Sequence, residues 1–221
     1  MGLNGSPMRH NEMKSTRLEA FSDGVIAIIV TIMVLELHVP HEDGIAGLWS
    51  VAPRLGMYLL SFLMVGIYWI NHHELVRRCE TVDYGILWAN LIFLFGLSVV
   101  PYFTDYVSEK HFSSFSVALY AVSLVISGAT FYILRAAVMR RQKHIGTFAQ
   151  TDRAEAWKHT ASLLLYLVAI PVAYRQPMLS ISIDIVVTLI WIIPEIGVRK
   201  YTDEAAGEIS STRSRRERGT L

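Results

Sequence analysis

Six long apolar runs divide this chain, and runs of that length constrain its fold more than any other feature. They cover about residues 18–39, 54–71, 84–103, 115–138, 156–174 and 178–198. A helix that crosses a bilayer needs roughly 20 mostly apolar residues, because the hydrocarbon core is about 30 Å thick. The runs therefore predict an all-α membrane protein with six transmembrane helices, embedded in a lipid bilayer.

The composition agrees with that class and excludes several others. Hydrophobic residues make up 52% of the 221 residues and charged residues only 18%, against about 45–50% and about 25% in soluble domains. A formal net charge of +1 argues against nucleic acid as a partner. The single cysteine, Cys79, excludes an internal disulfide and a cysteine-rich metal site. Nucleophiles and metal ligands are scattered, so we expect neither an enzyme nor a small-molecule substrate.

Basic residues between the runs predict the orientation in the membrane. If the N-terminus is cytoplasmic, the inside segments hold 17 Lys and Arg residues and the outside segments hold three. Such an excess is typical of cytoplasmic loops, so both termini are expected in the cytoplasm. The predicted organisation is an N-terminal tail over residues 1–16, a membrane domain over 17–198 and a basic, disordered tail over 199–221.

The first run contains an ionisable residue, Asp23, and a charge inside a span indicates a functional site. At about 100° per residue, Ser22 and Asp23 fall on the side of the helix opposite a smooth, mostly apolar stripe. The stripe contains Arg17, Phe21, Gly24, Ile28, Thr31, Ile32 and Leu35. Periodicity leaves open whether this stripe faces lipid, a neighbouring helix or a narrow pore.

The second run offers polar partners for Asp23. Trp69 and His73 are four residues apart and share a helix face, and His72 is adjacent to that face. A carboxylate paired with an indole N–H or an imidazole would be satisfied there. No metal site is expected, because neither this pair of histidines nor His38 and His41, in the outer loop between the first two runs, is accompanied by cysteines or a tight carboxylate cluster.

These residues resemble a known family, the transmembrane protein 175 family of potassium channels. The resemblance in the first helix is carried by Arg17-x-x-x-Phe21-Ser22-Asp23-Gly24 and then Ala27-Ile28-x-x-Thr31-Ile32-x-x-Leu35-Glu36. The second helix is similar through Trp69-x-x-His72-His73, the third through Leu87-Trp88-x-Asn90-Leu91 followed by Pro101, and the sixth through Trp191-x-x-Pro194. The resemblance covers about residues 17–198.

The resemblance implies an architecture and a set of site residues. A chain with one six-helix unit is expected to form a homotetramer, with a central pore lined by four copies of the first helix. By position, Ile28 is the main constriction, Ile32 and Leu35 are further apolar rings and Thr31 is a hydroxyl ring. Ile32 stands where leucine is expected in many relatives. The implied inter-helix network contains Arg17, Phe21, Ser22, Asp23, Trp69, His72, His73 and Asn90.

The implied function is a potassium channel, weakly selective over sodium, in the cytoplasmic membrane of a prokaryote. The chain contains no T-V-G-Y-G-like segment, so we expect no re-entrant carbonyl filter, and the isoleucine constriction would act as both filter and gate. Potassium is the permeant ion, and no cofactor is expected. A proton-conducting channel of the same architecture and a secondary transporter remain alternatives, although a transporter usually has internal inverted repeats and none is visible.

Overall fold

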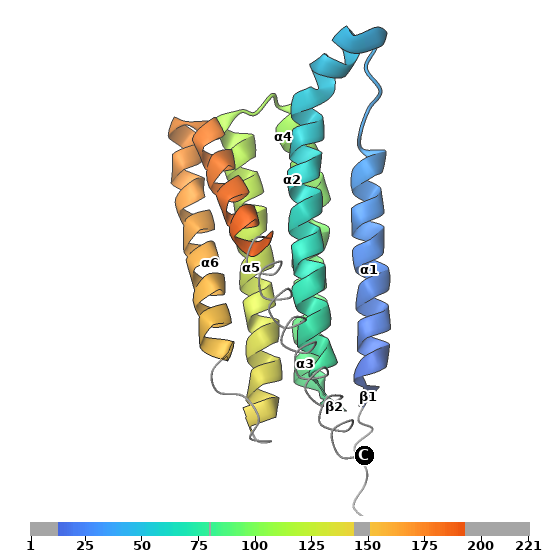
Figure 1. Cartoon of the computed structure of the whole chain (residues 1–221), viewed down its shortest axis with the longest axis vertical. Helices are drawn as coiled ribbons and strands as arrows, with labels where there is room; N and C mark the ends of the chain where they lie inside the picture. Colours follow the sequence, from blue (N-terminus) through green and yellow to red (C-terminus); the bar gives the residue numbers. More distant parts are fainter. Residues whose placement is uncertain (1–12, 80, 144–150, 193–221) are drawn as a thin grey trace, which may run out of the picture.

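The computed structural model describes residues 13–79, 81–143 and 151–192, which form long helices lying side by side (Figure 1). In chain order the elements are β1 (Met13–Lys14), α1 (Ser15–Leu35), α2 (Gly44–Arg77), β2 (Thr81–Val82), α3 (Tyr84–Ser98), α4 (Val100–Glu109), α5 (Ser114–Lys143) and α6 (Thr151–Arg175). A further helix, Pro177–Ile192, follows α6. The predicted tail 199–221 and residues 1–12 of the other predicted tail lie outside the described residues.

The prediction of six transmembrane helices is wrong. Within the described residues, four helices are long and apolar enough to cross a membrane: Ser15–Leu35, Gly44–Arg77, Tyr84–Glu109 and Ser114–Arg141. The helix Pro177–Ile192 is shorter, and at about 1.5 Å per residue it extends only about 24 Å. The apolar part of α6 is bounded by Lys158 and Arg175. The structure is thus mostly helical, with four helices of spanning length and one small strand pair that the all-α prediction omitted.

The second helix begins earlier than its apolar run predicts. The carboxylate of Asp43 accepts a hydrogen bond from the backbone N–H of Gly44 and caps the start of α2. Pro53 then lies inside the helix, where its ring cannot donate a backbone hydrogen bond. The first part of α2 bends away from the rest of the bundle (Figure 1). The predicted loop before residue 54 is therefore largely helical.

The third run is divided into two helices. Asp83 caps α3 by accepting a hydrogen bond from the N–H of Ile86, and α3 ends at Ser98. Val99 separates it from α4, and Pro101 lies in the first turn of α4, a position that proline tolerates because the backbone donor has no partner there. The α4 helix continues beyond the predicted end of the run, as far as Glu109.

Several contacts position α1 at one edge of the bundle. It packs against α2, α3 and α4, while α5 and α6 pack together on the opposite side (Figure 1). The strands β1 and β2 pair antiparallel, with Met13 opposite Val82. Because β1 directly precedes α1 and β2 precedes α3, this pairing fixes the start of α1 beside the start of α3.

Candidate pore helix and its polar network

One face of α1 packs into the interior of the chain. Its buried residues are Leu18, Ser22, Ile26, Ile29 and Met33. Their spacing of three or four residues is that of a single helix face. This packing leaves another part of the α1 surface, which includes Ile28, exposed in the single chain.

The predicted apolar stripe lies on that outward surface. Ile28 is 59% exposed, Ile32 42% and Leu35 78% within the single chain. The hydroxyl of Thr31 donates to the backbone carbonyl of Ile28 at 2.9 Å, so its lone pairs remain available to another donor or to a cation. An apolar helix face of this kind must face lipid, pack against another copy of the chain or line a narrow hydrophobic pore.

Two polar contacts join the first half of α1 to the end of α2. The indole N–H of Trp69 donates to a carboxylate oxygen of Asp23 at 2.8 Å, and Nδ1 of His73 lies 2.8 Å from a carboxylate oxygen of Glu19. The two α1 residues, Glu19 and Asp23, are four apart, as are the two α2 residues, and the two helices are antiparallel. The contacts therefore form two successive rungs between the same helix faces.

A third contact is buried and involves three helices. Asn90 of α3 donates through its amide to the Ser22 hydroxyl at 3.0 Å, and its carbonyl oxygen lies 2.7 Å from Nε2 of His72 on α2. Because that oxygen only accepts, His72 donates through Nε2. Ser22 in turn donates to the carbonyl of Leu18. All three bridging side chains are fully buried, so the chain of hydrogen bonds fixes α1, α2 and α3 together.

The structure brings together most of the predicted network and leaves two members outside it. Arg17 forms no hydrogen bond or ion pair within the described residues, and Phe21 is 52% exposed on the outward stripe. Glu19 is the contact that sequence reasoning missed. Its position one turn before Asp23, matching the position of His73 one turn after Trp69, is the signal that would have identified it.

Aromatic packing surrounds the buried histidine. The ring of His72 stacks on Phe93 with centroids 5.6 Å apart, and Phe93 contacts both Tyr68 and Phe131. The second ring nitrogen of His72, Nδ1, has no hydrogen-bond partner among the described residues. Among the described residues, Asn90 is therefore the one hydrogen-bond partner of this buried imidazole.

Comparison with known proteins places the same segment in a family. A family model described as the endosomal/lysosomal potassium channel TMEM175 matches residues 17–101, which include α1 from its third residue onward, the rungs and Asn90. A potassium channel of Chryseobacterium sp. (strain P1-3) is 39% identical over 192 residues, covering 87% of this chain and all of that protein.

More distant relatives include a solved structure. The crystal structure of a lysosomal potassium-selective channel TMEM175 homolog from Chamaesiphon minutus superposes with a TM-score of 0.67 at 26% identity, over 81% of this chain and 97% of that one. The human endosomal/lysosomal proton channel TMEM175 is 36% identical over 103 residues, covering 40% of this chain and 20% of that protein. The spanning helices, the full-length bacterial relative and the matching structure show that this integral membrane protein belongs to the TMEM175 family, among its bacterial members.

Proposed function

We propose that the protein is a potassium channel that assembles as a homotetramer in the cytoplasmic membrane, with one α1 from each copy lining a central pore. The observation that carries this proposal is the outward stripe of α1, where apolar side chains and one hydroxyl remain uncovered by the chain's own helices. The full-length relative from Chryseobacterium is named a potassium channel, and the family model covers the whole of the stripe.

The proposed filter and gate is the ring of four Ile28 side chains. An apolar ring of this kind forces a passing cation to lose part of its hydration shell, and the loss costs less for potassium than for sodium. The Thr31 hydroxyls, whose protons are held by the Ile28 carbonyls, would offer lone pairs in place of the lost water. Without a full cage of oxygen ligands, the preference for potassium is expected to be weak.

The rungs at Asp23 and Glu19 and the buried chain through Asn90 would orient the stripe toward the pore axis. These contacts lie on the side of α1 that faces α2 and α3. They hold the rotation of the helix about its own axis, and that rotation decides which residues meet at the centre. The network is therefore proposed to position the pore helix without contacting the ion.

The direct test is potassium flux in proteoliposomes, with sodium-loaded vesicles as the comparison. Ile28→Asn is expected to increase the flux and lower the preference for potassium, because an amide weakens the apolar barrier. Val34→Asn is the matched control: Val34 is also exposed on α1, at 47%, but lies about 120° around the helix from Ile28. The assignment fails if Ile28→Asn is neither more conductive nor less selective than the control.

A second candidate is a proton channel of the same architecture. This candidate is favoured by a relative, the human endosomal/lysosomal proton channel TMEM175, which aligns with part of this chain. An apolar constriction passes protons along transient files of water. Replacing potassium by a large impermeant cation separates the two functions: a proton channel retains its pH-driven current, and a potassium channel loses its current.

A further inference from the structure

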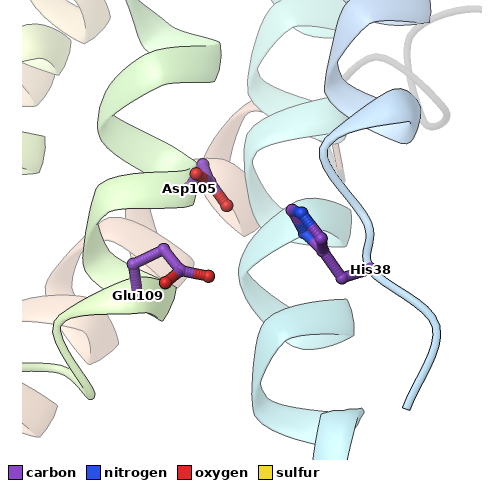
Figure 2. Close-up of side chains that lie close together, drawn as sticks. All are labelled: His38, Asp105 and Glu109. Atoms are coloured by element: carbon purple, nitrogen blue, oxygen red, sulfur yellow. The ribbon is translucent and has the colours of Figure 1, made fainter. Parts of the chain in front are cut away.

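A histidine and two carboxylates converge at the end of the bundle where α1 leads into α2. A ring nitrogen of His38 and one carboxylate oxygen from each of Asp105 and Glu109 all lie within 4.8 Å of one another. Figure 2 shows His38, in the segment after α1, facing the two acidic side chains across a gap to α4. The residues are distant in sequence, so the fold alone brings them together.

The histidine is held as a metal ligand is usually held. Nδ1 of His38 lies 2.9 Å from the backbone carbonyl of Glu36, and a carbonyl only accepts, so Nδ1 carries the proton. The neutral ring then has its lone pair on Nε2. Histidines that bind metals commonly donate their other ring N–H to a backbone carbonyl in this way, which fixes both the tautomer and the ring orientation.

The charge around the group favours a cation. Two carboxylates face the imidazole, and a third, that of Glu36, lies close enough to act on Asp105 electrostatically. Arg54 is the neighbouring positive charge, and it pairs with Oε1 of Glu109. The second oxygen of Glu109 remains available, and both acidic side chains are on the last two turns of α4.

We propose that His38, Asp105 and Glu109 bind a divalent transition-metal ion of the zinc class. One imidazole nitrogen and two carboxylate oxygens form a ligand set that suits zinc, with water in the fourth position, whereas calcium and magnesium take oxygen ligands only. His38 and Glu109 are exposed and Asp105 is half-buried, so an ion in solution can reach the group.

A bound ion would join the segment after α1 directly to the end of α4. The sequence argued against metal at His38 because neither a cysteine nor a tight carboxylate cluster accompanies the histidines of this loop. The carboxylates are supplied instead by α4, which reaches this end of the bundle because it continues to Glu109 after the break at Val99. Zinc binding can be measured directly, so the proposal can be tested without a channel assay.

The test is calorimetric titration of the purified full chain in detergent with zinc chloride, and with calcium chloride as the selectivity probe. His38→Gln is expected to weaken zinc binding by about tenfold or more, a loss typical of disturbed metal coordination. His41→Gln is the matched control, because His41 is an exposed histidine of the same segment outside the group. It should bind zinc as the unmodified protein does, and calcium should bind weakly to all three proteins.

Two further measurements keep the result interpretable. Asp105→Asn preserves shape while removing a ligand charge, so it should weaken zinc as His38→Gln does. Copper(II) in place of zinc should give an electron paramagnetic resonance spectrum with nitrogen hyperfine structure that His38→Gln removes and His41→Gln retains. The proposal is overturned if zinc binds equally to all the variants, if the His41 control loses as much affinity as His38→Gln, or if zinc does not bind below millimolar concentration.

Discussion

The buried hydrogen bond between His72 and Asn90 can be measured by a double-mutant cycle. Asn90→Leu removes two hydrogen bonds, of 2.7 Å to His72 and 3.0 Å to Ser22, and leaves the imidazole with no partner because its Nδ1 already has none. An unsatisfied buried donor costs about 1–3 kcal/mol. We expect Asn90→Leu to reduce the free energy of unfolding by about 2–4 kcal/mol, the hydrogen bonds included.

The single change His72→Leu and the double variant complete the cycle. His72→Leu leaves the side-chain carbonyl of Asn90 without its hydrogen-bond donor but keeps the hydrogen bond from the Asn90 amide to Ser22. The change should therefore cost about 1–3 kcal/mol. In the double variant both partners are apolar, and the combined cost should fall below the sum by about 1 kcal/mol, which lies between the average of about 0.6 and the maximum of about 1.7 kcal/mol found for interhelical hydrogen bonds in membranes. The lost stacking on Phe93 occurs with and without Asn90 and cancels.

The assay is reversible unfolding in mixed micelles as the fraction of sodium dodecyl sulfate rises, followed by tryptophan fluorescence. All variants are compared at one protein concentration, because association shifts apparent stability. A control cycle pairs Asn90→Leu with Asn71→Leu, since among the described residues the Asn71 amide bonds only to the Ile67 carbonyl of its own helix; those costs should add. If the costs of His72→Leu and Asn90→Leu also add within about 0.5 kcal/mol, the proposed coupling between them is refuted.

Three further predictions use other parts of the molecule. Gly96→Ala should lower the melting temperature, because its Cβ would lie 2.7 Å from a hydroxyl oxygen on α5, whereas Gly66→Ala, with nothing within 4 Å, should hold or raise it. Asp23→Ala and Trp69→Phe should each reduce potassium flux, and the double variant should lose little more, because both changes break the same hydrogen bond; additive losses would contradict this. Thr31→Val should lower the potassium-to-sodium flux ratio, and an unchanged ratio would remove Thr31 from the proposed filter.

Helical segments were predictable from the sequence, and their limits were not. The apolar runs identify helices because burial of apolar side chains acts over whole turns. Ends depend on single residues: Asp43 starts α2 ten residues before the predicted boundary, and Val99 divides the third run. The number of spans was also predicted wrongly, since four helices in the described part of the chain are long and apolar enough to cross a membrane.

In the candidate site, too, features within one helix could be predicted from the sequence, whereas contacts between residues far apart in the chain could not. Positions on α1 follow from helical periodicity, so the outward stripe could be proposed from residue numbers alone. The partner of His73 could also have been found, because Glu19 continues the rung spacing from Asp23. The approach of His38 to Asp105 and Glu109 could not, because it depends on how far α4 continues after Val99.

The uneven attachment of α1 has a mechanical consequence. Every side-chain hydrogen bond or ion pair that the structure describes between α1 and another helix lies between Glu19 and Asp23. Leu35, at the other end, is about 18 Å from Asp23 along the helix axis. A tilt of about 10° about the attached end therefore sweeps Leu35 sideways by about 3 Å, roughly the diameter of a water molecule. Among the described contacts, polar side chains therefore hold the first part of α1, whereas apolar packing alone holds the part that contains Leu35.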